Sequence, residues 1–364
     1  MPEQSRSARS ALVLSGVFIA VALALAARFS FVGHTDRLLD MGLYRHYQTS
    51  DAIWYAAGIA ALALIQGIAL VRSRRNPTWI SPKAALLGGG IAAAAFVSMY
   101  PVSAIDIFNY ASQTRVWTDL GQNPNVVPPS VLPESNWTHF SGEWVVRPSP
   151  YGPLWRWIAA PATFLAGDNL ILAVVLIKIT LLLLLLVAAW MVGDIVARRG
   201  GSRSSGIIAV MWSPLVLWEG IGNGHNDLAM GALLVAAIWF WQRDNQQGTI
   251  PMVVAAALVK YTVVLVGPVI ALGSWLREKR SDRVRTPIWW FIDSALIVVV
   301  GFWPFYAVRP IIDMARSQSN ITLTSPLWLV QRQLDGRWGA EDIASIYKPA
   351  AIVLLAIVIL WQLG

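Results

Sequence analysis

A single carboxylate, Asp106, opens the longest polar stretch of the chain and stands directly after an apolar run. The aromatic residues Phe108 and Tyr110 follow it closely. Partial desolvation in such a place raises a carboxyl pKa, and a raised pKa suits a general base. The plain alternative is a surface acid or cap at the start of the next helix. Asp106 is therefore a candidate catalytic base, and Tyr110 a candidate substrate contact.

The segment PSPYGPLW, residues 148–155, contains three prolines and a glycine. Proline fixes φ, and such a run restricts the backbone strongly. The segment therefore predicts rigidly held positions for Tyr151 and Trp155. Two readings remain open, a loop that shapes a substrate site and a simple junction from loop to helix.

A third polar element is NGHND, residues 223–227. It places His225, Asn226 and Asp227 together at a predicted helix start, where an asparagine often caps the first turn. The chain has four histidines, and they share no metal-binding spacing. We therefore expect these residues to bind a polar substrate or cap the helix. No cofactor is predicted, and a divalent metal is not indicated.

Lys260 lies inside the apolar run 250–275. A charge at membrane depth is costly and tends to mark function. Its ammonium could bind a lipid-linked phosphate, or form a structural ion pair with Asp227 or Glu219. Guanidinium groups bind the same anion in bidentate fashion. Three arginines are outside-facing candidates for it: Arg115, Arg147 and Arg309.

Composition defines the setting of these residues. Of 364 residues, 56% are hydrophobic and 13% are charged, against about 25% charged in soluble domains. Several apolar runs reach the roughly 20 residues that cross a bilayer. The net charge of +8 comes from short basic loops, which indicates membrane topology and anionic headgroups rather than nucleic acid. The chain has no cysteine, so disulfides and thiolate metal sites are excluded. We expect an all-α polytopic membrane protein.

Charge between the apolar runs predicts the topology. Basic loops at 72–83, 197–205 and 275–285 are expected in the cytoplasm. One transmembrane domain, 1–364, then has two outer loops, 102–168 and 307–345. The predicted spans are 11–32, 52–71, 84–101, 169–196, 206–220, 227–242, 286–306 and 347–363.

Two segments fit no simple span. A helix over 153–167 would be about 22 Å long, short of the roughly 30 Å hydrocarbon core. We expect an interfacial or re-entrant helix there. The run 250–275 has cytoplasmic signals at both ends, which predicts two short helices that enter and return, with Lys260 near the turn. The alternative is one span that violates the charge rule once.

The order of these elements resembles the GT-C glycosyltransferases, and most closely the actinobacterial polyprenol-phosphate-mannose-dependent α-1,6-mannosyltransferases. The resemblance covers roughly 95–270 and rests on DIFNYASQTRVWTDLGQNPN, PSPYGPLW, NGHND and the lysine in an apolar run. It implies a GT-C-like transmembrane bundle whose large outer loop carries short interfacial helices. The family residues that it maps onto this chain are Asp106 as base, Tyr151, Gly152, Pro153, His225, Asn226, Asp227 and Lys260.

The resemblance implies that a hexose, here mannose, passes from a polyprenyl-phosphate donor to a hydroxyl of a glycan or glycolipid acceptor. The active site would face outward from the plasma membrane, among membrane lipids. Two departures exist. The large loop follows the third span, and Asp106 is followed by Ile107 and Phe108, so the Asp-X-Asp pair of some relatives is absent. The second departure weakens the case for a catalytic metal.

One carboxylate suffices for an inverting displacement when cations stabilise the departing phosphate. A β-linked donor would then give an α-product. Hydrolysis is disfavoured, because 101–155 shows no clear pair of carboxylates at set spacing. Two other classes stay open. A transporter or flippase would use Lys260 as its binding charge, but the matched halves of such proteins are missing. For a scaffold protein, Asp106 would be dispensable.

Overall fold

The computed structural model describes residues 2–31 and 48–305, and this part of the chain is helical. Its one β-type contact is an isolated antiparallel bridge between Ser30 and Met99. The α-helices are α1 (Pro2–Arg28), α2 (Thr49–Arg75), α3 (Pro82–Val97), α4 (Asp106–Leu120), α5 (Asn136–His139), α6 (Pro153–Ala166), α7 (Leu170–Arg198), α8 (Arg203–Met211), α9 (Asp227–Trp241), α10 (Gln246–Val259), α11 (Gly267–Arg277) and α12 (Arg285–Phe302). Short 3-10 turns are η3 (Pro129–Val131), η4 (Gly142–Val146) and η6 (Tyr261–Leu265), and η5 (Val216–Gly222) is π-helical.

Four of the described helices are long and apolar enough to cross a membrane: Ser7–Arg28 of α1, then α2, α7 and α12. The pair α8 and η5 would make a fifth if it counts as one span. The helices α3, α9 and most of α10 are apolar but shorter. These findings confirm the all-α polytopic membrane architecture. The predicted span 347–363 and the predicted outer loop 307–345 lie outside the described residues.

The predicted span 206–220 is divided by a bend. α8 ends at Met211, and η5 begins at Val216 after a bend of 56°. Pro214 lies at the break. Proline lacks the N–H for the helical ladder and clashes with the preceding turn, so a regular helix stops before it. After the bend, η5 runs directly into the NGHND turn, which leads to α9.

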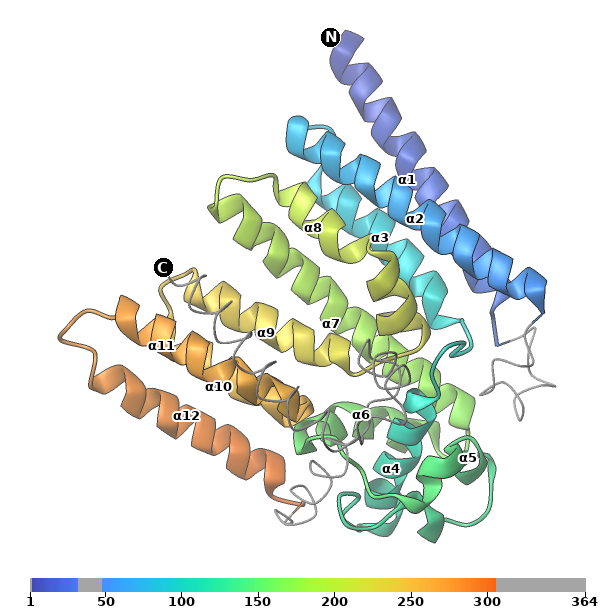
Figure 1. Ribbon diagram of the computed structural model, residues 1–364, viewed down its shortest axis with the longest axis vertical. Coiled ribbons are helices and arrows are strands. Elements are labelled where there is room, and N and C mark those ends of the chain that lie inside the picture. The colour runs from blue at the N-terminus through green and yellow to red at the C-terminus, as the bar shows by residue number, and fades with distance from the viewer. Residues whose placement is uncertain (1, 32–47, 306–364) are drawn as a thin grey trace, which may run out of the picture.

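The connections predicted to be cytoplasmic share one end of the bundle (Figure 1). The hydroxyl of Ser204 donates to the carbonyl of Ile80 over 2.7 Å and joins the α7–α8 and α2–α3 connections. The side chain of Arg243 forms an ion pair with Asp194 of α7 over 2.9 Å. The basic loops are therefore on one side of the bundle, as the charge pattern predicts.

The run 250–275 has the predicted hairpin form. α10 ends at Val259, Lys260 is extended with φ −146°, and η6 leads into α11. At the end of α11 the Arg277 guanidinium lies 4.0 Å from the centre of the Trp241 ring. Trp241 ends α9 shortly before α10 begins. Both ends of the hairpin therefore lie beside the end of α9, and the chain turns back near Lys260.

The opposite end of the bundle carries α4, α5 and α6 (Figure 1). The predicted short helix is present as α6, with Pro153 in its first turn. Trp157, Phe164 and Leu165 are exposed along it, which suits a helix lying at the membrane interface. Arg156 is fully buried and points into the protein instead of toward headgroups.

A buried lysine anchors the segment that leads to Asp106. Lys178 of α7 is fully buried, and its ammonium donates to the carbonyl of Met99, just beyond the end of α3. The same ammonium lies 5.2 Å from the ring centre of Phe31. α7 packs against α3, α4, α6, α8 and α9 and is the central helix of the bundle. Lys178 therefore links the segment that precedes Asp106 to this central helix.

Candidate active site

Asp106 is the first residue of α4, with Ile105 in the cap position. A carboxylate there is favoured by the helix dipole. Its Oδ1 accepts a hydrogen bond from the Tyr151 hydroxyl over 3.1 Å. Its Oδ2 lies 3.7 Å from His225 Nε2. The side chain keeps 38% of its surface exposed, so one acid can be both held by protein groups and open to a ligand.

The expected rise in the Asp106 pKa is wrong. Burial does raise the pKa of this carboxyl, but hydrogen bonding to His225, the His225 charge and the Tyr151 hydroxyl together hold it below its usual value. The sequence indicated the desolvation but not the two partners. Asp106 is therefore ionised throughout the neutral range.

His225 lies between two carboxylates. Its Nε2 faces Asp106, while its Nδ1 is 3.2 Å from Glu219 Oε2 and 3.0 Å from the Glu219 carbonyl oxygen. Burial lowers the pKa of this imidazole, but hydrogen bonds and charge from Asp106 and Glu219 outweigh it and raise the pKa to about 10. The ring is an imidazolium at neutral pH.

The NGHND turn reaches Asp106 because Gly224 permits it. Gly224 has φ +71°, a left-handed conformation that residues with a Cβ rarely adopt. A Cβ at this position would lie 2.2 Å from Ile107 Cδ1. Gly224 therefore lets the turn lie directly against the first turn of α4.

Tyr110, Tyr151, Trp155 and Asn226 form a packed layer beneath the acid. The Tyr110 ring meets Tyr151 and Trp155 edge to face, with centroid separations of 4.9 and 5.1 Å. The Tyr110 hydroxyl donates to Asn226 Oδ1 over 3.3 Å. Asn226 occupies the cap position of α9 but makes no side-chain capping bond. Tyr110, Trp155 and Asn226 are fully buried, so they support the site from below.

The tip of the hairpin adjoins the same cluster. The Gly152 N–H donates to the carbonyl of Val259 over 3.1 Å. A Cβ on Gly152 would lie 2.0 Å from the Leu258 carbonyl oxygen, so only glycine allows this approach. Next to it, Lys260 Nζ bonds both carboxylate oxygens of Asp227 at 2.8 Å. Of the partners considered for Lys260, the structure shows the ion pair with Asp227.

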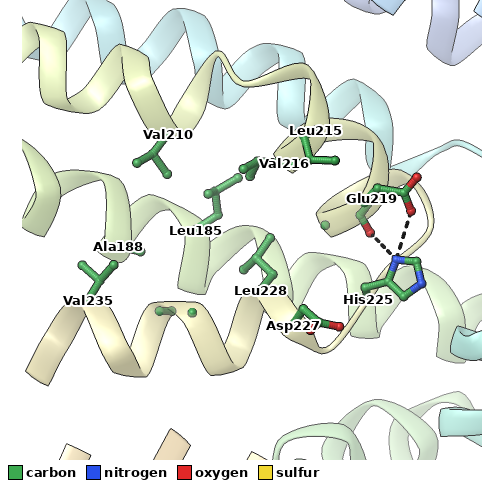
Figure 2. A pocket seen from close by; sticks show the side chains of 13 residues that line it. Leu185, Ala188, Val210, Leu215, Val216, Glu219, His225, Asp227, Leu228 and Val235 are labelled. Carbon is green, nitrogen blue, oxygen red and sulfur yellow. Dashed lines mark hydrogen bonds and ion pairs between the residues drawn. The ribbon is translucent and has the colours of Figure 1, made fainter. Parts of the chain in front are cut away.

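An apolar pocket of about 490 Å³ opens beside these groups. Figure 2 shows its apolar side chains extending along α7, α8 and α9, with Glu219, His225 and Asp227 at one end. The lining residues are Leu185, Ala188, Val210, Leu215, Val216, Glu219, Gly220, His225, Asp227, Leu228, Gly231, Ala232 and Val235. The pocket therefore suits a molecule with a long apolar part and a charged end.

Two predicted arginines are not part of this cluster. Arg115 bonds Asp119 over 2.5 Å, pairs with Asp168 and stacks on Trp137. Arg147 is exposed and stacks on Trp144 with 5.2 Å to the ring centre. Arg309 lies outside the described residues. A phosphate role for Arg115 and Arg147 stays a prediction, and each has other partners here.

Sequence reasoning considered Glu219 only as a partner of Lys260 and gave Arg156 no role in the site. Glu219 contacts His225, and the sequence signal was an acid inside the apolar run 206–220, where a charge is costly. Arg156 donates to Gln113 Oε1 over 3.0 Å and to Thr114 Oγ1 over 3.4 Å. Burial lowers its pKa to about 10, which leaves it charged at neutral pH near Tyr151 and Tyr110.

Within residues 2–31 and 48–305, no three His, Cys, Asp or Glu side chains are grouped so that they could hold a metal ion. The site there is built from ion pairs and hydrogen bonds. The absence of a cofactor stays a prediction, and transfer measured after chelation tests whether a divalent metal takes part.

Fold and site together define a polytopic helical membrane protein with a polar, carboxylate-bearing site at one end of its bundle and an apolar pocket leading to it. The family described as alpha-(1->6)-mannopyranosyltransferase, N-terminal domain, matches residues 9–277. Because this match covers well over half of the chain, the chain belongs to that family. The resemblance to actinobacterial mannosyltransferases is confirmed.

Individual relatives agree. The chain is similar to alpha-(1->6)-mannopyranosyltransferase A of Mycobacterium tuberculosis, with 25% identity over 269 residues that cover 71% of this chain and 49% of the relative. It is also similar to alpha-(1->6)-mannopyranosyltransferase A of Corynebacterium glutamicum, with 25% identity over 212 residues, 55% of this chain and 43% of the relative. The chain thus spans about half the length of these relatives. No solved structure matches it.

Proposed function

We propose that this protein transfers mannose from a polyprenyl-phosphate donor to a hydroxyl of a glycan or glycolipid acceptor, with inversion at the anomeric carbon. The site would face outward from the plasma membrane. The observation that carries the proposal is one ionised carboxylate, Asp106, linked through His225 to the charged end of an apolar pocket. Names of the relatives supply the sugar, and a β-linked donor would give the α-linkage in those names.

Asp106 is the proposed base. Its depressed pKa makes it a weak base toward a free hydroxyl. In a displacement at an anomeric carbon, however, the attacking hydroxyl becomes acidic as its oxygen bonds to carbon. A carboxylate already ionised at neutral pH can then accept the proton in the transition state. The Tyr151 hydroxyl and the imidazolium of His225 hold that carboxylate in one orientation.

Cations for the leaving group adjoin the pocket. As the C–O bond to phosphate breaks, the polyprenyl phosphate gains a negative charge, and preorganised positive groups stabilise it. His225 lines the pocket, and Lys260 is bound to Asp227, which lines it as well. In the proposed complex the donor phosphate competes with Asp227 for the Lys260 ammonium.

The apolar pocket is the proposed seat of the first isoprene units. Most of its lining side chains are aliphatic, and its charged groups lie at one end (Figure 2). Burial of apolar surface is worth about 25 cal/mol per Å², so an isoprenoid chain in the pocket would contribute strongly to donor affinity. A water-soluble sugar nucleotide would gain nothing from such a lining. Family membership favours this enzyme over the transporter or flippase alternative.

The deciding experiment uses membranes that contain the protein, a radiolabelled polyprenyl-phosphate mannose and a glycan acceptor. We expect Asp106→Asn to lower transfer by about 10²–10⁴-fold, the usual contribution of a general base. Glu134→Gln, at an exposed acid on the same polar segment, is the matched control and should transfer normally. Transfer by Asp106→Asn at the wild-type rate would remove Asp106 from its role, and no transfer by the wild type would contradict the proposed function.

A further inference from the structure

Glu219 is an acid in the bent element that follows α8. It lies in η5, within a run of apolar residues. Its carboxylate faces His225 Nδ1 at 3.2 Å, while His225 Nε2 faces Asp106. The imidazole therefore has one carboxylate at each nitrogen. Two acids from different elements, α4 and η5, are linked through a single cation.

Further hydrogen bonds hold Glu219 in place. Asn223 Nδ2 donates to Glu219 Oε2 over 2.7 Å, and the Ser103 hydroxyl donates to Oε1 over 3.4 Å. Asn223 Nδ2 also donates to Ser103 Oγ over 2.5 Å, and Trp218 Nε1 donates to the same oxygen over 3.2 Å. Both carboxylate oxygens are thus engaged, which restricts the Glu219 side chain to the orientation that meets His225.

We propose that Glu219 is a positioning residue of the active site, whose carboxylate keeps His225 as an imidazolium with Nε2 directed at Asp106. The inference rests on the proposed transferase function. In this role Glu219 touches neither sugar nor acceptor. It supplies the negative charge that stabilises the His225 cation, and that cation faces the Asp106 carboxylate and adds positive charge beside the donor phosphate.

The charged groups around His225 support the positioning role of Glu219. Asp106 faces it from α4 and Glu219 from η5. On α9, Asp227 is already bound to Lys260 of the hairpin. On the 148–153 turn, the Tyr151 hydroxyl is directed at Asp106. Glu219 is the nearer carboxylate of the pair, so its removal deprives His225 of the closer countercharge, while the contact of Nδ1 with the Glu219 carbonyl oxygen at 3.0 Å is kept.

The first test needs no transferase activity. Diethyl pyrocarbonate acylates an unprotonated imidazole, and mass spectrometry of the peptide containing His225 gives the rate at each pH. We expect slow modification of wild-type His225 at pH 8. In Glu219→Gln, which keeps the shape and loses the charge, the rate should rise at least about tenfold, because each unit by which the pKa falls raises the neutral fraction tenfold.

The pH dependence separates charge from exposure. Loss of Glu219 as countercharge should move the midpoint of the modification curve to lower pH, whereas a looser fold would raise the plateau and leave the midpoint unchanged. Glu134→Gln should keep the wild-type midpoint, and Glu219→Asp should restore most of it. An unshifted midpoint in Glu219→Gln overturns the proposal.

The second test measures kcat/KM of mannosyl transfer against pH. The His225 charge is present below its pKa and lost above it, so the alkaline limb should move to lower pH in Glu219→Gln. If the wild type transfers mannose but the variant keeps the wild-type limb, the positioning role is wrong and the transferase stands. If the wild type transfers nothing while the modification midpoint shifts, the coupling stands and the proposed function is wrong.

Discussion

At the scale of single residues, the site is an alternation of charges. Asp106, His225 and Glu219 form one linked set, and Asp227 with Lys260 forms a second at the same pocket. Each acid has a cationic partner, so the free site carries little net charge although it is rich in charged groups. An incoming phosphate would disturb this balance, and the variants below test how.

Tyr151→Phe removes one hydrogen bond from Asp106. The hydroxyl lowers the pKa of that carboxyl, so its loss raises the pKa. Transfer requires the ionised acid and fails as pH falls through the Asp106 pKa, so the acid limb of kcat/KM should move to higher pH. At pH 7 we expect a loss of about two- to tenfold, the worth of one hydrogen bond. An unshifted acid limb would show that Tyr151 does not act through Asp106.

Lys260→Met tests the phosphate role of the lysine. Loss of a hydrogen bond from a charged donor costs about 1.5–3 kcal/mol, so donor KM should rise about ten- to a hundredfold while acceptor KM changes little. Donor titrations of transfer at fixed acceptor measure both.

Asp227→Asn is the informative control for that experiment. It removes the partner of Lys260 and leaves the ammonium free for phosphate, so donor affinity should be kept or improved. If Asp227→Asn weakens the donor as much as Lys260→Met does, the pair is structural, and the lysine has no phosphate role.

At the scale of elements, the site depends on two short turns fitted against helix ends. The 148–153 turn lies against the end of α10 through the Gly152 N–H, and the NGHND turn lies against α4 through Gly224. Neither turn has regular structure to hold it. A side chain added at either glycine would therefore displace the turn. Substitution of these glycines tests the packing of the turns more directly than substitution of the exposed polar residues around them.

Gly152→Ala should separate the turn from the hairpin. Its Cβ would lie 2.0 Å from a backbone oxygen of Leu258, and backbone cannot move aside as a flexible side chain does. We expect Tyr151 to leave Asp106, with a fall in transfer and in the thermal midpoint of unfolding. Gly273→Ala in α11 is the matched control, since a Cβ there meets nothing within 4 Å. Equal behaviour of the two variants would contradict the packing argument.

Gly231→Leu tests the apolar pocket. Gly231 lines the pocket, and a Cβ there meets nothing within 4 Å, so the new side chain would extend into the space proposed for the lipid. Donor KM should rise more for a long polyprenyl chain than for a short one. Gly67→Leu, at an exposed position of α2 with equally open space, should have no such effect. The same response to both donor lengths would show that the lipid lies elsewhere.

At the scale of the whole molecule, the polar site and the basic loops lie at opposite ends of the bundle (Figure 1). Since basic loops favour the cytoplasm, this separation supports an outward-facing site. Residues 9–277, which match the family, include the site, the pocket and the whole hairpin.

Cysteine labelling tests this orientation directly, because the chain has no cysteine of its own. Glu134→Cys and Arg280→Cys introduce single thiols at exposed positions at the two ends. A membrane-impermeant maleimide should label Glu134→Cys in intact cells, and Arg280→Cys only after permeabilisation. Labelling of Arg280→Cys from outside would refute both the orientation and the hairpin.

Composition and local pattern were enough to predict much of the architecture. Long apolar runs predicted membrane helices, and the charge of the basic loops predicted that these loops lie at the same end of the bundle. The short helix after Pro153 and the hairpin around Lys260 followed from length and charge. Asp106 and His225 were identifiable as polar groups at predicted helix starts. Lys260 stood out because a charge inside an apolar run is costly. Tyr151 stood out because the prolines around it restrict the backbone.

Tertiary structure alone decided which of these groups meet. Arg115 and Asp106 share α4, yet Arg115 is bound to Asp119 and Asp168 while Asp106 faces His225. The Asp106 pKa falls because partners more than forty residues away in the chain outweigh its burial. A hydrogen bond from Ser103, 116 residues earlier in the chain, helps to hold Glu219 beside His225. Apart from the i,i+4 pair of Arg115 with Asp119, these interactions depend on contacts between distant segments, and local sequence patterns carry no record of such contacts.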